Sequence, residues 1–166
     1  MFGCILIAFV LAGLGDQTGT LTFTKPAAWT DRAAASSMRV AEFVVPRASG
    51  DSEDGEVIVY YFGGGGGSVD ANLQRWTSQF QSTKDPVRTT ATVNGLKLTS
   101  LDVSGTYVAE MRPGSAEHYN KPGYRMRATV VETPKGPYFI KLTGPAKTID
   151  SAGAAFEQFL HSLAFK

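Results

Sequence analysis

The sequence predicts an α+β fold, an α/β/α sandwich in which a mostly antiparallel sheet of about six strands lies between two main amphipathic helices. The antiparallel part rests on two hairpin signals, the Asn94-Gly95 dipeptide and the stretch 133–136 (TPKG). The helices rest on two stretches in which large apolar residues recur with helical spacing, residues 68–80 and 148–163. Strict alternation of strand and helix, which is typical of a parallel sheet, does not occur.

The first half of the chain contains three expected strands. Residues 19–23 alternate apolar and polar side chains, residues 37–45 end at Pro46, and residues 56–62 form an apolar and aromatic run. Residues 48–55 are rich in glycine and acids, and their spacing does not match a calcium loop. We therefore expect a solvated hairpin loop between the second and third strands.

The first helix is expected to begin at Ser68, whose hydroxyl can accept a hydrogen bond from an unpaired backbone N–H. Its apolar stripe consists of Val69, Leu73, Trp76 and Phe80, with Asn72, Arg75 and Gln79 on the other face. Burial of one large side chain contributes about 1.5–3 kcal/mol. We therefore expect Trp76 to pack on the sheet rather than to stack on a ligand.

The second half of the chain contains two expected hairpins and the final helix. Residues 88–93 pair with 96–103, and residues 124–132 pair with 137–143. In the second hairpin, charged and apolar residues alternate. The alternation predicts one outward face that carries Arg125, Arg127 and Lys141, opposite Tyr138, Ile140 and Leu142. The final helix runs from a capping Thr148 to Leu163.

Composition limits the function classes. The chain has 166 residues, enough for one domain, and its 16 basic and 15 acidic residues leave a net charge of +1. This balance argues against a protein that coats nucleic acid through many phosphate contacts. Cys4 is the only cysteine and lies near the N-terminus. A processed chain would then have no thiol for a disulfide, a nucleophile or a metal site.

The N-terminus contains an uncharged apolar run over residues 5–14. The run is too short for a membrane-spanning helix and has the length of a signal-peptide core, although no Lys or Arg precedes it. We expect residues 1–15 to be an export signal or membrane anchor and residues 16–166 to be a single domain. The protein would be periplasmic, secreted or membrane-attached, and would contact a membrane only through this segment. A buried N-terminal strand is the alternative.

A glycine-rich turn between strand and helix is the first candidate site, because such turns offer backbone N–H groups to anions. Its residues are Gly63, Gly64, Gly65, Gly66, Gly67 and Ser68. The turn lacks the lysine of a P-loop, and Ser68 occupies the last glycine position of the dinucleotide pattern. The alternative is a flexible connection without a ligand.

The second candidate site is the non-periodic segment 109–123, since long loops in compact domains are often functional. It supplies Arg112, His118, Tyr119 and Lys121. Together with Arg125, Arg127 and Lys141 these residues predict a basic surface for an unidentified protein or a small anionic ligand. The alternatives are an irregular cover over the sheet edge and basic residues paired singly with nearby acids.

Enzymatic chemistry is the weaker hypothesis. The chain has two histidines and no G-x-S-x-G nucleophile motif. A small hydrolase or transferase would use His118 with Glu117 or Asp102. His161 and Glu157 lie one turn apart on the final helix and lack the further ligands that a metal needs. We expect no metal and no cofactor.

Two segments, 61–80 (YFGGGGGSVDANLQRWTSQF) and 136–163 (GPYFIKLTGPAKTIDSAGAAFEQFLHSL), resemble uncharacterised bacterial envelope proteins. Their order of elements is similar to that of the PsbP-like superfamily, which also includes the nuclear Ran-release factors. The resemblance covers about residues 19–163 and implies an α/β/α sandwich around an antiparallel sheet. It also implies an assembly or accessory role, and it brings no catalytic residues.

Overall fold

The computed structural model of the chain describes residues 19–81 and 84–166. In this part, one sheet has eight strands in the order β2-β3-β4-β9-β8-β7-β5, and β6 also pairs with β7. The strands are β2 (Thr30–Arg32), β3 (Arg39–Val45), β4 (Gly55–Tyr61), β5 (Phe80–Gln81), β6 (Val87–Val93), β7 (Leu96–Tyr107), β8 (Lys121–Glu132) and β9 (Tyr138–Pro145). A small second sheet pairs β1 (Leu21–Thr22) with β10 (Ala164–Phe165).

All of these pairings are antiparallel, as expected, but the sheet is larger than six strands. The additional members are short. β2 has three exposed residues, and β5 consists of Phe80 and Gln81, where the first helix was expected to continue. Such short strands have no periodic pattern, because their pairing comes from neighbouring strands rather than from their own side chains.

The structure has three described helices, α1 (Val69–Thr77), α2 (Ala146–Ser151) and α3 (Gly153–His161). Ser68 caps α1 as predicted, since its Oγ accepts a hydrogen bond from the N–H of Ala71 at 3.2 Å. The single final helix predicted from Thr148 is instead two helices that meet at Ala152. The Thr148 backbone N–H donates to Asp51 Oδ2 at 2.9 Å, so a distant loop caps α2.

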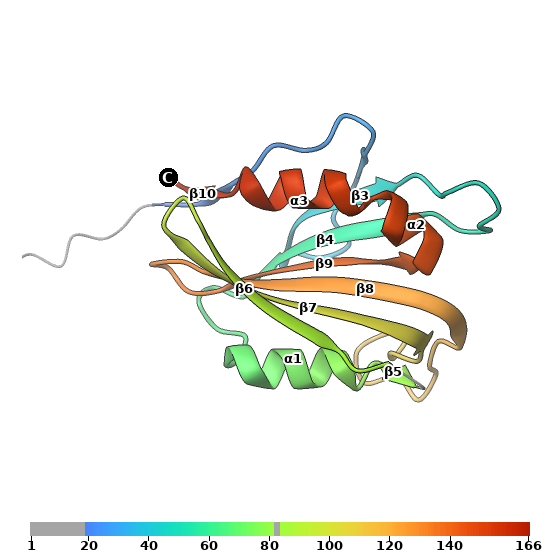
Figure 1. The fold of residues 1–166 in the computed structure, drawn as a ribbon. Helices are drawn as coiled ribbons and strands as arrows, with labels where there is room; N and C mark the ends of the chain where they lie inside the picture. Colours follow the sequence, from blue (N-terminus) through green and yellow to red (C-terminus); the bar gives the residue numbers. More distant parts are fainter. Residues whose placement is uncertain (1–18, 82–83) are drawn as a thin grey trace, which may run out of the picture.

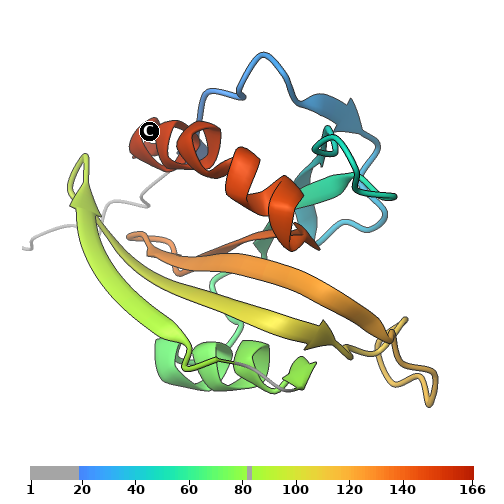
Figure 2. The same cartoon turned by 45° about the vertical axis from the view of Figure 1, so that its right-hand side comes forward.

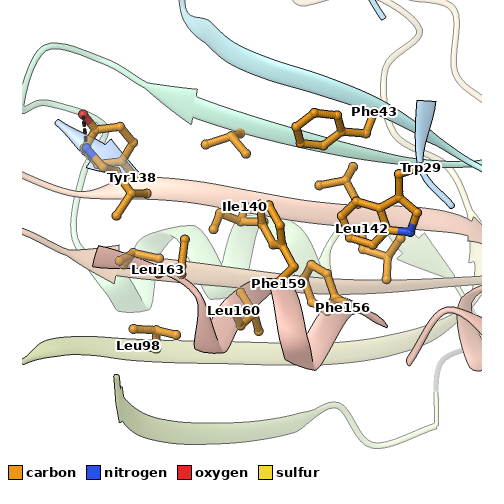
Figure 3. Close-up of a cluster of buried hydrophobic side chains, with 14 of the residues drawn as sticks. Trp29, Phe43, Leu98, Tyr138, Ile140, Leu142, Phe156, Phe159, Leu160 and Leu163 are labelled. Carbon is orange, nitrogen blue, oxygen red and sulfur yellow. Dashed lines mark hydrogen bonds between the residues drawn. The ribbon is translucent and has the colours of Figure 1, made fainter. Parts of the chain in front are cut away.

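The helices cover opposite faces of the sheet. Figure 1 shows α1 on one side and α2 with α3 on the other, and Figure 2 shows the sheet curving around α3. Each face has its own core. On the α1 face, Trp76 is 1 % exposed and packs with Phe139. On the other face, Phe159 of α3 packs against Trp29 and Phe43 (Figure 3).

Alternation along β9 assigns its side chains to these two cores. Phe139 belongs to the α1 core, and Ile140 and Leu142 belong to the α3 core. The described part of the chain is therefore a sheet-dominated α+β fold. None of its helices is both long enough and apolar enough to cross a membrane. The expected export segment lies outside the described residues.

Candidate functional site

A cavity of about 570 Å³ lies on the α1 side of the sheet. Its walls come from β3, β4, β9, α1 and the segment that follows β7. The volume falls within the range of small-molecule sites, roughly 300–1,000 Å³. Two of the sequence candidates from segment 109–123, His118 and Tyr119, line it together with Lys141, whereas Arg112 and Lys121 do not.

Lys141 lies in the sheet between Ile58 of β4 and Ala128 of β8. Its ammonium donates a hydrogen bond to Gln79 Oε1 at 3.1 Å, and no carboxylate of the described residues lies within ion-pair distance. Burial, with a smaller contribution from the positive charge of Arg75, lowers the pKa of Lys141 to about 8. The cavity therefore contains an amine that titrates close to neutral pH.

Two arginines also line the cavity and differ in their partners. Arg39 is paired, because its Nη1 lies 3.0 Å from Glu42 Oε1 and its guanidinium is 5.6 Å from the centre of the Tyr60 ring. Arg75 donates to the neutral Asn72 Oδ1 at 2.7 Å, and no carboxylate of residues 19–81 or 84–166 pairs with it. Lys141 and Arg75 thus supply positive charge that is not neutralised by an ion pair.

Asn72 supports this arrangement and was missed in the sequence, where it was placed on the outer face of the helix. It is 2 % exposed, and its Nδ2 donates to the carbonyls of Gly66 at 2.8 Å and Ser68 at 2.9 Å. One side chain therefore connects the glycine turn to α1 and holds Arg75. The available signal was an asparagine four residues after a capping serine, a position from which it can bond the loop carbonyls.

The cavity also has aromatic walls. Tyr60 stacks on Phe62 with ring centres 5.9 Å apart, and Tyr107 stacks on Tyr119 at 5.6 Å. Burial strongly raises the pKa of Tyr107, which keeps its phenol neutral. The site thus combines positive charge with aromatic surface.

The glycine turn is shaped by its neighbours. Four of its residues have positive φ, namely Gly63 (63°), Gly64 (90°), Gly66 (110°) and Gly67 (84°). A Cβ on Gly66 would lie 2.6 Å from the Phe139 ring, and a Cβ on Gly136 would lie 2.5 Å from Gly64 Cα. Glycines are therefore required where the turn packs against the β8–β9 hairpin. Packing accounts for them, and anion binding by the turn stays a prediction.

The candidates outside the cavity have local partners. Lys121 pairs with Glu53 at 2.5 Å and also bonds the Tyr124 hydroxyl at 3.3 Å. Arg112 lies 3.6 Å from Glu117. The sequence candidates are thus divided between the cavity and the surface.

The predicted basic face is wrong. Arg125 is opposite Gly144 and Arg127 is opposite Leu142, whereas Lys141 is opposite Ala128, so the arginines and Lys141 lie on different faces of the sheet. The prediction assumed one solvated face, but helices cover both. Arg125 Nε donates to Asp102 Oδ1 at 2.8 Å and also contacts Asp150, while Arg127 contacts Glu157.

The geometry also bears on the enzymatic hypothesis. Asp102 lies on the face opposite the cavity, because its neighbours Leu101 and Val103 belong to the α1 core and Asp102 pairs with Arg125. The Nδ1 of His118 is 2.9 Å from the carbonyl of Val108, to which it donates. Within the described ranges, no carboxylate contacts this ring. Asp102 is therefore wrong as a partner for His118.

No protein-family model and no curated protein matches the chain. Two solved structures are similar to it. A protein of unknown function from Pseudomonas aeruginosa has a TM-score of 0.55 and 17 % identity, with 87 % of this chain and 96 % of that chain covered. The solution structure of cyanobacterial PsbP (CyanoP) from Synechocystis has a TM-score of 0.50 and 14 % identity, with 95 % and 98 % covered. The chain therefore has a PsbP-like fold.

Proposed function

We propose that this chain is an exported, non-enzymatic accessory or binding domain, and that the cavity beside α1 binds a small anionic ligand. One observation carries the proposal. Lys141 and Arg75 both line the cavity, and no carboxylate of the described residues lies within ion-pair distance of either.

A buried positive charge is costly without a counter-ion. Burial disfavours the charged form of an amine, which is why the pKa of Lys141 is lowered to about 8. A bound anion would supply the missing partner through charge-assisted hydrogen bonds. Because Lys141 belongs to a central strand, the anion would meet a rigidly held group.

Binding accounts for the site better than hydrolysis does. A general base needs an orienting partner within hydrogen-bond distance. His118 donates from Nδ1 to a backbone carbonyl, and its predicted acidic partners are engaged elsewhere, Asp102 with Arg125 and Glu117 with Arg112. No further observation favours the hydrolase or transferase alternative.

Export is part of the proposal and rests on the apolar run at residues 5–14. Intact mass of the protein from its native source provides the test. We expect either a chain that begins near Asp16 or a full-length chain in the membrane fraction. A full-length chain in the cytoplasmic fraction would exclude export while leaving ligand binding open.

Ligand binding can be tested with the fluorescent probe 8-anilinonaphthalene-1-sulfonate, an aromatic anion. We expect saturable binding of one probe to the folded wild-type protein. Lys141→Met should weaken it about tenfold or more, because a hydrogen bond to a charged group contributes about 1.5–3 kcal/mol. Arg75→Met, at an exposed helix position, should also weaken binding of the probe.

Lys97→Met is the matched control. Lys97 is an exposed lysine on β7 that pairs with Glu132 at 3.1 Å and does not line the cavity. Its replacement should leave the probe affinity unchanged. Equal affinity in the wild type, Lys141→Met and Arg75→Met would refute the proposed site.

A further inference from the structure

The residues that line the cavity differ in their exposure to solvent. Met38, Phe62 and Met111 line the cavity and are 50 %, 37 % and 46 % exposed. Large apolar side chains gathered in this way on a surface mark binding sites more often than isolated ones do. The cavity therefore combines solvent-exposed apolar side chains with the buried ammonium of Lys141.

We propose that the ligand is a flat aromatic monocarboxylate, with its carboxylate at Lys141 and Arg75 and its ring against the aromatic walls. This inference rests on the proposed function and specifies the ligand. It makes no use of covalent chemistry, and binding is reversible.

The aromatic part follows from the walls. Tyr60 and Phe62 come from β4 and the residue after it, and Tyr107 comes from β7, so the stacked pairs originate on opposite sides of β9 in the sheet order. Lys141 lies on β9, between these two sides. Aromatic rings associate with one another in offset-stacked and edge-to-face geometries, so the ring of a planar ligand can pack against one of these pairs while its carboxylate reaches β9. An inorganic anion would leave most of the 570 Å³ volume unoccupied.

The single negative charge follows from the balance of ionic groups. Arg39, Arg75 and Lys141 line the cavity, but so do Glu56 and Glu110. Glu42 pairs with Arg39, whereas Arg75 and Lys141 have no carboxylate of the described residues within ion-pair distance and can contact an anion. Glu56 is paired with Arg32 at 2.5 Å, so Glu110 is the lining carboxylate that would repel a polyanion such as a nucleotide. One carboxylate matches the planar fork of an arginine and the point charge of a lysine.

The test compares four probes by isothermal titration calorimetry at pH 7. They are 2-naphthoate, its neutral analogue 2-naphthylmethanol, the aliphatic carboxylate octanoate, and sulfate. We expect one site for 2-naphthoate, with at least about tenfold weaker binding of the other three. Sulfate or octanoate binding as tightly as 2-naphthoate would overturn the aromatic assignment and leave the anion site intact.

Two other outcomes are also decisive. Equal binding of 2-naphthylmethanol and 2-naphthoate would show that the cavity selects apolar bodies without regard to charge, which overturns both this inference and the proposed function. Binding of 8-anilinonaphthalene-1-sulfonate without any binding of 2-naphthoate would overturn the inference alone.

A pair of matched variants tests where the aromatic ring of the ligand lies. Phe62→Ser removes an exposed aromatic side chain of the cavity and should weaken 2-naphthoate about fivefold. Val87→Ser removes an apolar side chain that is also exposed, at 57 %, and does not line this cavity, so it should have no effect. Equal affinities in the two variants would place the ring elsewhere and contradict the inference.

Discussion

Lys141 of β9 lies directly opposite Ala128 of β8, on the face of the sheet that α1 covers. The alanine is 0 % exposed and brings only a methyl group, and Ile58 is the neighbour on the other side. Arg75 approaches from α1, Arg39 from β3 and Glu56 from β4, so the ammonium interacts with two cations and one carboxylate. Lys141 is therefore expected to lower stability in the absence of a ligand.

Lys141→Met should increase the free energy of unfolding at pH 7 by about 1–3 kcal/mol, because methionine keeps the apolar stem and removes the charge. The pKa of Lys141 is about 8 in the folded protein and ordinarily 10.5. Between these values the unfolded chain binds more protons, so this lysine's penalty is complete below pH 8 and disappears as the pH approaches 10.5. Urea denaturation of both proteins from pH 7 to 10 should show the difference shrinking. A less stable variant at pH 7 would contradict the assignment.

The affinity for an anion should fall with rising pH, whereas the stability of the wild-type protein should rise. The affinity of the wild-type protein for 8-anilinonaphthalene-1-sulfonate should fall as the pH rises above about 8, because Lys141 loses its charge there. Any other group that lines the cavity should affect Lys141→Met and the wild type alike. Fluorescence titrations of both proteins at pH 7 and 9.5 provide the measurement. An equal decrease in both would assign the effect to another group.

The glycine turn offers a pair of contrasting substitutions. Gly66→Ala should destabilise by about 2–4 kcal/mol, since its Cβ would meet the Phe139 ring at 2.6 Å and φ is 110°. A Cβ added at Gly63 would have no atom within 4 Å, and φ there is 63°. Gly63→Ala should therefore lower the free energy of unfolding by only about 1 kcal/mol. Chemical denaturation gives both values. Equal costs would mean that packing against β9 does not determine the shape of the turn.

Reversal of Arg125 and Arg127 to glutamate should destabilise the fold. The two new carboxylates would lie next to Asp102, Asp150 and Glu157, which now pair with these arginines. We expect a loss of at least about 2 kcal/mol, from several partly exposed pairs and new like-charge repulsion. Arg112→Glu, where the side chain is 80 % exposed, should cost under about 0.5 kcal/mol. Similar unfolding midpoints for the double variant and Arg112→Glu would show that the ion pairs contribute little.

Trp76→Ala should cost about 3–5 kcal/mol, because it removes the largest fully buried side chain of the α1 core and leaves a cavity against Phe139. Gln74→Ala, at an exposed position of the same helix, should cost under about 0.5 kcal/mol. Thermal and urea denaturation of the two variants provide the comparison. A small effect at Trp76 would mean that α1 contributes little to the stability of the sheet.

Local patterns were sufficient for several elements of the fold. The Asn94-Gly95 turn has the positive φ values, 47° and 81°, that its two-residue hairpin requires. Ser68 caps α1, and Trp76 packs on the sheet as its helical stripe predicted. In each case the outcome depends on residues that are close together in the sequence, so propensity and periodicity determine it.

The candidate site was only partly predictable for the same reason. His118, Tyr119 and Lys141 were named from the sequence and do line the cavity, but Arg75 and Asn72 were assigned to an outer helix face. Asp51 was expected in a solvated loop, yet it caps α2 across 97 positions of sequence. Contacts between residues this far apart in the sequence are determined by how the layers of the fold pack, which no local pattern encodes.

The sequence by itself determined which side chains within β8, and which within β9, share a face, because successive side chains of any strand point to opposite faces. Only the tertiary structure decided which side chains of β8 lie on the same side of the sheet as which side chains of β9, since that depends on the register between the two strands. A shift of one residue would place Lys141 with Arg125 and Arg127, and the observed register places it with Ala128. Helices lie on both sides of this sheet, so the contrast of polar and apolar residues that usually identifies the solvent side is weakened at β8 and β9. The separation of the cationic cavity from the arginine ion pairs is therefore a property of the assembled layers.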